Sequence, residues 1–343
     1  MRLEPPSWWY NSKSSPIANA LRPLSWVWGT ITGTRMSAQS RYHASLPVIC
    51  VGNFTMGGAG KTPTAIFISD YLKSRGEQPA FLSRGYGGTL KGPHMVNTEV
   101  DSAARVGDEP LLLARHAPTV IAQNRIEGAA MLETSGATAI IMDDGFQNTA
   151  LHKDLATVVI DGGVGIGNAM VAPSGPLRAP IEQQHTMCDA IIILGNNDPE
   201  HDSIKTLRQT YAGPILSAQI IADDDTTWME NTKIIAFAGI GRPEKFFQTV
   251  RKLTPNLIDT LTFPDHHNFT EKDAKNLLAR AFAEDAVLLT TEKDWVRLPT
   301  HIEVLNELRQ QSHTLPIRLE FDGDDETELA KLVDIALSTR KTT

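Results

Sequence analysis

Short apolar runs alternate with amphipathic stretches from residue 46 onward. The runs have the length and bounding turns of buried strands, and they are Leu46–Val51, Pro79–Ser83, Thr119–Ala122, Ala137–Met142, Ala156–Ile160 and Asp189–Leu194. Between the early runs, Thr62–Arg75 and Asn124–Thr134 have the 3.6-residue periodicity of helices. This alternation predicts an α/β fold with a mostly parallel sheet that helices cover on both faces.

A polar stretch from Ile221 to Thr232 interrupts this rhythm, and we interpret it as a boundary. A second alternation follows it, and its elements are Lys233–Ala238, Pro243–Leu253, Leu257–Phe263, Thr270–Phe282 and Ala286–Thr291. The pattern predicts a second, smaller α/β lobe. The last strand, Pro316–Phe321, and a helix from about Asp325 fit either lobe on pattern alone.

The composition is that of an ordinary globular protein. The chain has 343 residues, enough for two domains that each bury a core. Its two cysteines, Cys50 and Cys188, lie in or beside apolar runs. This usage indicates a reducing compartment and argues against a disulfide framework or a zinc site.

Charge is distributed unevenly between an N-terminal arm, residues 1–45, and the rest of the chain. The arm carries a net charge of +4, whereas the whole chain carries −8. Four of the six tryptophans also lie in the arm, namely Trp8, Trp9, Trp26 and Trp28. The acidic body argues against general nucleic-acid binding. The basic, tryptophan-rich arm has the composition that an anionic membrane surface attracts.

The arm is predicted to form an amphipathic helix rather than a membrane span. Its best apolar stretch, Ile17 to Ile31, contains Asn19 and Arg22 and is shorter than the roughly 20 apolar residues that a span needs. Ser15-Pro16 is a plausible helix start. An apolar stripe then falls on one helical face, formed by Leu24, Val27, Trp28 and Ile31. The stripe either packs on the body of the protein or enters a membrane surface, and the pattern leaves both alternatives open.

The stretch "VGNFTMGGAGKTP" joins a predicted strand to a predicted helix. It supplies the glycines, the lysine and the hydroxyl of a P-loop, which wraps backbone N–H groups around phosphates. The residues predicted to hold ATP are Thr55, Gly57, Gly58, Ala59, Gly60, Lys61 and Thr62. The strict pattern has glycine where this chain has Thr55, so a plain glycine-rich turn is the alternative. The strand before the loop and the helix after it favour the P-loop.

An acidic pair, Asp143-Asp144, ends the apolar run of "ATAIIMDDGFQ". A carboxylate at the end of a strand next to a P-loop is typical of a Mg²⁺ site. We therefore predict that Thr62, Asp143 and Asp144 hold Mg²⁺. The alternative is a simple Asp-Gly turn.

Three further loops carry side chains of interest. In "GDEP", Asp108 is either a helix N-cap or the carboxylate that a kinase uses to accept a hydroxyl proton. In "SRGYGG", Arg84 and Tyr86 are candidate substrate contacts. In "FPDHHNF", the two histidines either form a partly exposed pair or serve the reaction, and His266 is our candidate.

The series "GNFTMGGAGKTP", "SRGYGG", "GDEP", "DDGFQ", "SGPLR", "FAGIGRPEKFF", "FPDHHNF" and "TTEKDWVRL" resembles the tetraacyldisaccharide 4'-kinase family. The motifs occur in family order over nearly all of the body. The resemblance implies transfer of the γ-phosphate of ATP, with Mg²⁺, to the 4'-hydroxyl of the acylated glucosamine disaccharide precursor of lipid A. It also implies attachment to the inner face of the cytoplasmic membrane, peripheral or monotopic.

The resemblance assigns roles to individual residues. It implies that Lys61 binds the phosphates, that Asp108 is the general base and that His266 is paired with that base. It also implies that Arg178 lies near the reaction and binds the substrate. It also implies a division into the arm 1–45, a kinase lobe 46–225, a smaller lobe 226–312 and a return segment 313–343. Asp108 and His266 then come from different lobes and meet when the cleft closes.

Two positions depart from the common family pattern. Ala179 follows Arg178 where a glutamate is usual, and Asn148 follows "DDGFQ" where a histidine is usual. Any contact that those two residues make in the family is therefore absent or relocated here.

Two rival interpretations keep the P-loop but change the function. A deviant P-loop ATPase that positions other molecules at membranes needs a lysine where this chain has Met56. A switch GTPase needs an Asn-Lys-x-Asp motif, which the sequence lacks.

Overall fold

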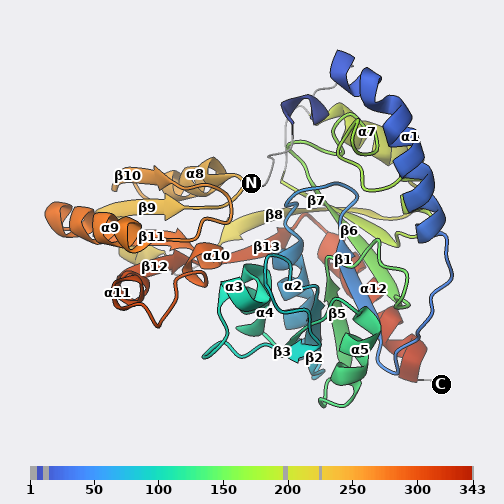
Figure 1. The fold of residues 1–343 in the computed structure, drawn as a ribbon, viewed down its shortest axis with the longest axis horizontal. Coiled ribbons are helices and arrows are strands. Elements are labelled where there is room, and N and C mark those ends of the chain that lie inside the picture. Colours follow the sequence, from blue (N-terminus) through green and yellow to red (C-terminus); the bar gives the residue numbers. More distant parts are fainter. Residues whose placement is uncertain (1–5, 11–14, 196–199, 224–225, 342–343) are drawn as a thin grey trace.

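A computed structural model describes residues 6–10, 15–195, 200–223 and 226–341. Two sheets divide this part of the chain, as Figure 1 shows, and we call the surrounding regions the large lobe and the small lobe. Three charged residues counted for the arm, Arg2, Glu4 and Lys13, lie outside the described residues. So do residues 224–225 of the predicted polar boundary.

The large lobe is built on a nine-stranded sheet. Its order is β13 (Ile317–Phe321), β8 (Ile215–Ala222), β7 (Ala190–Leu194), β6 (Leu155–Asp161), β1 (Val48–Gly52), β5 (Ala139–Asp143), β2 (Pro79–Ser83), β4 (Thr119–Ile121) and β3 (His94–Met95). All neighbours pair in parallel except β13 with β8 and β3 with β4 at the two edges. The predicted mostly parallel sheet is confirmed.

Helices cover both faces of this sheet, because its central strands are apolar on both sides. In β1, Ile49 and Val51 belong to one core while Val48 and Cys50 belong to the other. The first core contains side chains of α2 (Lys61–Ser74), α4 (Asp108–Ala114) and α12 (Asp325–Lys341). The second contains side chains of α1 (Pro16–Met36), α5 (Arg125–Glu133) and α7 (Asp202–Thr210), with α6 (Ile181–His185) packed against it. A short helix, α3 (Ala103–Val106), precedes α4.

The small lobe contains a parallel four-stranded sheet. Its order is β10 (Leu257–Thr262), β9 (Ile234–Ala238), β11 (Val287–Thr291) and β12 (Ser312–Leu315). The helical elements are η2 (Thr227–Asn231), α8 (Pro243–Leu253), α9 (Glu271–Glu284), α10 (Glu292–Trp295) and α11 (Glu303–Gln311). The lobe thus has the predicted α/β pattern.

The chain returns to the large lobe after β12. Leu315 is the last residue of the small sheet, and β13 starts at Ile317 in the large one. This crossing lies slightly beyond the expected boundary at residue 313. The polar stretch expected from Ile221 starts inside β8, whose last residue is Ala222. The division into separate folding domains stays a prediction.

The arm forms η1 (Ser7–Trp9) and the predicted helix α1, which begins at Pro16 with the Ser15 side chain as its cap. Small side chains face the body, since Gly29 lies against Val171 and Pro180, and the Ser25 hydroxyl donates to the Val171 carbonyl at 2.6 Å. The buried residues of α1 are Ala18, Ser25, Gly29, Gly33 and Met36.

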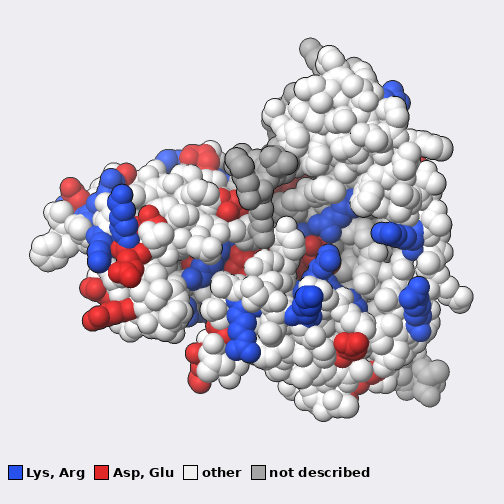
Figure 2. All heavy atoms as spheres, viewed as in Figure 1, with Lys and Arg blue, Asp and Glu red and all other residues white. Residues whose placement is uncertain are grey.

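The predicted apolar stripe of α1 points away from the body. Its members are exposed by 60% (Leu24), 50% (Val27), 43% (Trp28) and 40% (Ile31), and Trp26 beside them by 75%. The alternative that the stripe packs on the protein is therefore wrong. In Figure 2 the surface over this part of the molecule is mostly uncharged. Within the described chain, no helix has both the length and the hydropathy to cross a membrane.

Candidate active site

The P-loop connects β1 to α2, as predicted. Gly57 and Gly60 have φ of 113° and 86°, which side chains disfavour, and a Cβ at Gly60 would lie 2.3 Å from the Leu194 side chain. The buried Asn53 donates from Nδ2 to the Gly57 carbonyl at 2.9 Å. Asn53 thus closes the loop onto its strand. It belongs to the quoted loop motif, but no sequence pattern predicted a role for it.

The acidic pair lies beside the P-loop because β5 pairs with β1. Val51 and Asp143 are register partners, and the Asp144 amide donates to the Val51 carbonyl at 2.9 Å. The Asp144 carboxylate lies 3.8 Å from Lys61 Nζ. The side chains predicted to bind nucleotide and metal are therefore brought together.

Arg178 joins the acidic pair to the P-loop. Its guanidinium donates from Nε to the Thr55 carbonyl at 3.0 Å and from Nη1 to Asp144 Oδ1 at 3.0 Å. Burial would raise the pKa of Asp144, but Lys61 and then Arg178 outweigh it, so the pKa is lowered. Asp144 also has a positive φ of 53°, which a non-glycine residue rarely adopts. Arg178 therefore links the nucleotide loop to the acidic pair, and its contact with a substrate stays a prediction.

Asp143 is a candidate metal ligand with a buried oxygen that lacks a hydrogen-bond partner in the described chain. The residue is 3% exposed, and the oxygen concerned is Oδ1. Burial raises its pKa to about 7, more than the nearby Lys61 lowers it. An unpartnered buried carboxylate oxygen next to a P-loop fits Mg²⁺, which prefers oxygen ligands. Thr62, the second residue of α2, and Asp144 are its neighbours in the predicted site.

Asp108 is not an N-cap. It is the first residue of α4, Gly107 occupies the cap position, and no capping hydrogen bond forms. The side chain is buried and faces the small lobe instead, where His266 Nδ1 lies 2.9 Å from its Oδ2. The two candidates for base and partner are thus in contact across the lobes. His267 diverges from His266 and contacts Asp273 at 3.0 Å, as expected for adjacent side chains.

Two basic residues of the small lobe complete the surroundings of Asp108. Arg297 donates to Asp108 Oδ2 from Nε at 2.8 Å and from Nη2. Lys293 bonds to Glu109 at 2.6 Å and lies 3.8 Å from Asp108. Burial alone would raise the pKa of Asp108, but the His266 hydrogen bond and the charges of Lys293 and Arg297 hold it far below its usual range. Both basic residues belong to "TTEKDWVRL", and no sequence pattern predicted a role for either.

Asp108, Glu109 and His266 each offer one ligand atom within 4.8 Å of the others, a spacing that a metal ion could use. The Lys293 ammonium already contacts two of the three. Protein cations therefore balance this cluster, and we do not assign a second metal to it.

The loop "SRGYGG" follows β2 and packs on the loop before Asp108. A Cβ at Gly107 would lie 2.6 Å from the Tyr86 carbonyl, and one at Gly88 would lie 2.6 Å from the Arg105 carbonyl. Glycine permits this close approach. Arg84 and Tyr86 are both exposed on this loop.

The two departures from the family pattern have local explanations. Ala179 is fully buried, and its carbonyl accepts from Gln184 Nε2 at 2.8 Å. As an alanine, it offers no polar side chain to a ligand. Asn148 instead closes a turn, because its Oδ1 accepts from the Ala150 amide at 3.1 Å.

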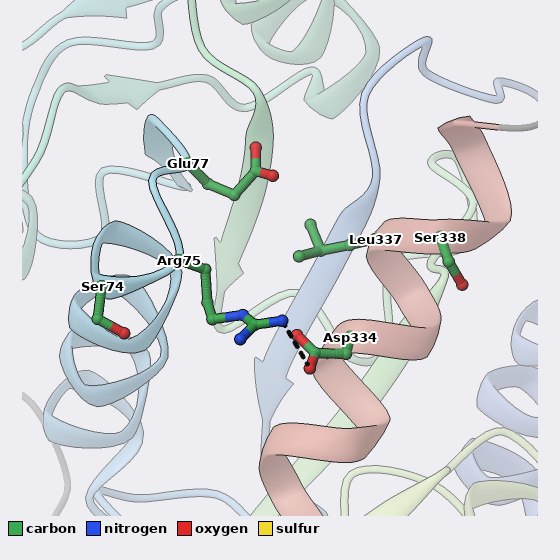
Figure 3. A pocket seen from close by; sticks show the side chains of 6 residues that line it. All are labelled: Ser74, Arg75, Glu77, Asp334, Leu337 and Ser338. Atoms are coloured by element: carbon green, nitrogen blue, oxygen red, sulfur yellow. Dashed lines mark ion pairs between the residues drawn. The ribbon is translucent and has the colours of Figure 1, made fainter.

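A separate cavity of about 420 Å³ lies between α2 and α12. Figure 3 shows its lining, including the Arg75–Asp334 ion pair at 3.5 Å. It lies at the C-terminal end of α2, whereas the P-loop lies at the N-terminal end, so it is not the nucleotide site.

Comparisons with known proteins agree with this arrangement. A family model described as "Tetraacyldisaccharide-1-P 4'-kinase" matches residues 17–337. Tetraacyldisaccharide 4'-kinase of Rhizobium meliloti (strain 1021) is 45% identical over 338 residues, 98% of this chain and 96% of that protein. A protein of the same name from Methylorubrum extorquens is 43% identical over 327 residues, 95% of this chain and 97% of that protein.

A solved structure is similar in fold. The "apo" form of LpxK from Aquifex aeolicus in complex with ATP superposes with a TM-score of 0.73, covering 94% of this chain and 99% of that chain at 24% identity. At this identity the likeness concerns the fold. Together, the matches support the kinase interpretation over the positioning ATPase.

Proposed function

The chain belongs to the tetraacyldisaccharide 4'-kinase family and is an ATP-dependent kinase; from this premise we propose its acceptor and the roles of its residues. The acceptor is the 4'-hydroxyl of a tetraacylated glucosamine disaccharide 1-phosphate. One observation carries the proposal: Asp108 pairs with His266 at the same edge of the large sheet as the P-loop. The loop that packs on Gly107 follows β2, and β2 pairs in parallel with β5, which ends at Asp143.

The donor side consists of the P-loop and the acidic pair. Lys61 and the loop N–H groups from Thr55 to Thr62 bind the ATP phosphates, and Thr62, Asp143 and Asp144 hold Mg²⁺. When bound, Mg²⁺ neutralises the negative charge that develops on the transferred group. Arg178 holds Thr55 and Asp144 in position relative to each other by hydrogen bonds to both.

The acceptor side consists of the Asp108–His266 pair. The acceptor oxygen attacks the γ-phosphorus, the bond between that phosphorus and the bridging oxygen of ADP breaks, and the hydroxyl proton passes to Asp108. His266 orients the carboxylate through the 2.9 Å contact. Arg84 and Tyr86 on the neighbouring loop contact the substrate.

The outward stripe of α1 attaches the enzyme to the cytoplasmic face of the membrane. Large exposed apolar patches on soluble proteins mark interaction sites, and exposed Trp26 and Trp28 suit a lipid interface. Basic residues near an anionic leaflet contribute about 1 kcal/mol each. An acylated acceptor stays in the membrane, so the enzyme must work at its surface.

The acceptor is tested with purified protein, ATP and Mg²⁺. We expect phosphate transfer to the acylated disaccharide 1-phosphate at the 4' position and none in its absence. Hydrolysis of ATP that does not depend on the disaccharide would contradict the proposal.

The membrane attachment is tested with a Trp26→Gln/Trp28→Gln variant and anionic vesicles. We expect weaker vesicle binding with ATP binding intact. Phe282→Gln is the matched control, because Phe282 is 91% exposed but lies on the small lobe. Equal loss of vesicle binding in the control would exclude a specific role for α1.

A further inference from the structure

Arg297 is a buried cation that reaches from one lobe into the other. Its side chain is 3% exposed, and it lies two residues after α10, in the small lobe. Its partner Asp108 lies 189 positions earlier in the chain, in the large lobe. Two of its nitrogens donate to the same oxygen, Asp108 Oδ2. Two charge-assisted hydrogen bonds to one oxygen hold that oxygen firmly beside the guanidinium.

Other groups of the small lobe fix the position of the Arg297 guanidinium. Nη1 of Arg297 donates to the Gly239 carbonyl at 2.6 Å and to Asp294 Oδ1 at 2.7 Å. Asp294 is itself fixed, because its Oδ2 accepts from the Gly239 amide at 3.0 Å and from the Thr291 hydroxyl at 2.7 Å. The position of Arg297 therefore follows the position of the small lobe.

The basic groups around Asp108 all contact the same oxygen of its carboxylate. His266 Nδ1, Lys293 Nζ and Arg297 each have their contact with Oδ2. None of these three contacts involves Oδ1, and the neighbouring Glu109 side chain is a further hydrogen-bonding partner of the carboxylate. Arg297 supplies more of these contacts than either other residue, and it is the most deeply buried of the three.

We propose that Arg297 is a positioning residue: it turns Asp108 toward the acceptor hydroxyl, and it does so only while the small lobe rests on the large one. The proposal builds on the role of Asp108 proposed above. It explains why the base lies at a lobe contact, since Arg297, together with His266, then couples the direction of Asp108 to closure of the lobes. An acceptor that holds the lobes apart would leave Asp108 misdirected.

The test compares two Arg297 variants with a control. Arg297→Gln removes the charge, and Arg297→Lys keeps it but loses the planar fork that spans Asp108 and Gly239. Arg309→Gln is the control, because Arg309 also packs in this segment, over the Trp295 ring at 3.7 Å, without touching Asp108. We expect kcat to fall about 100-fold in Arg297→Gln, the usual cost of a misplaced catalytic group. The KM for ATP stays as in the wild type, and Arg309→Gln keeps its kcat.

Two readouts separate positioning from a merely structural role. Added guanidinium should restore part of the kcat of Arg297→Ala, but not that of Asp108→Ala. The double variant Asp108→Ala/Arg297→Gln should be no slower than Asp108→Ala alone, because residues that act as a unit are not additive. If Arg297→Gln fails to fold, Arg297→Lys carries the same test.

The outcomes also separate this inference from the role of Asp108. An inactive Asp108→Ala with a fully active, folded Arg297→Gln would overturn the inference alone. Multiplicative losses in the double variant would do the same. An active Asp108→Ala would overturn the base assignment itself, and the inference with it.

Discussion

The two sides of the proposed site are built in different ways. The P-loop side is local: Asn53 holds a carbonyl four residues away, and Lys61 and Asp144 belong to the same lobe. The Asp108 side joins groups 158 and 189 residues apart, from both lobes. The first side is complete within the large lobe, whereas the second exists only where the lobes touch. This difference suggests that the nucleotide can bind without closure and that transfer requires it.

Backbone strain is nonetheless common to both sides. Asp144 and His266 have φ of 53° and 56°, in the left-handed region that non-glycine residues rarely occupy. In the described chain only Ala169 and Asp285 share this property among non-glycine residues. Such backbone strain persists where the contacts around a residue hold it in that conformation, and it is concentrated at functional sites. Each side of the site has one such residue.

The largest expected effect is on the P-loop side. Lys61→Ala should lower kcat by about 10³-fold, because the developing charge on the transferred group loses its ammonium partner. Lys73→Ala is the control, since Lys73 forms a surface ion pair with Asp70 in the same helix. Steady-state kinetics with saturating acceptor measures both. A Lys61→Ala enzyme within about tenfold of the wild type would remove the basis of the P-loop assignment.

The Asp108 side should give a comparable but distinct signature. Asp108→Ala and His266→Ala should each slow turnover, by about 10²-fold or more, with ATP affinity unchanged. The double variant should be little worse than the poorer single one, because the pair acts as a unit. Loss of ATP binding in either single variant would mean that the two sides are not separable as described.

The sequence predicted the local side better than the distant one. The strand, loop and helix around Lys61 and the strand end at Asp143 follow from periodicity and glycine placement alone. The contact between Asp108 and His266 followed only from the family resemblance. Arg297 was missed because its role depends on the apposition of two lobes, which no local pattern encodes. The available signal was an arginine two residues after Trp295 in the charged motif "TTEKDWVRL".

The pattern left the direction of the apolar stripe of α1 open for a related reason. The pattern identified the apolar stripe, but large apolar side chains normally pack inward. Here the buried face consists of small residues such as Gly29 and Gly33, which lie close to the body of the protein. The periodicity of large apolar residues does not reveal such a face. β12 (Ser312–Leu315) was likewise absent from the prediction, because "SHTL" lacks a buried-strand pattern.

A smaller effect is expected from pH on the metal-free enzyme. Asp143 binds its proton up to about pH 7 when folded, whereas an unfolded aspartate releases it near pH 4. Between these values the folded state binds more protons, so stability falls as pH rises, by about 1.4 kcal/mol per unit at most. Asp143→Asn should abolish this slope in thermal melts without Mg²⁺. Mg²⁺ affinity should change in the opposite direction and rise with pH, because the metal needs the ionised carboxylate. A wild-type melting temperature independent of pH over this range would refute the raised pKa.

The smallest effect is expected where the lobes meet at their rim. Asp161, the last residue of β6, accepts from Arg242 Nη1 and Lys245 Nζ of the small lobe, each at 2.8 Å. These basic side chains are 40% and 58% exposed, unlike Arg297. Exposed ion pairs contribute about 0 to 1 kcal/mol and are screened by salt.

Asp161→Asn should therefore change kcat by no more than about threefold, and added salt should reduce the difference from the wild type further. Arg297→Gln should retain its full deficit at the same salt concentrations, because its contact with Asp108 is shielded from solvent. Measuring both variants across a salt series compares a rim contact with a buried one between the same two lobes. If Asp161→Asn proved as slow as Arg297→Gln, closure in general, and not the orientation of Asp108, would limit the reaction.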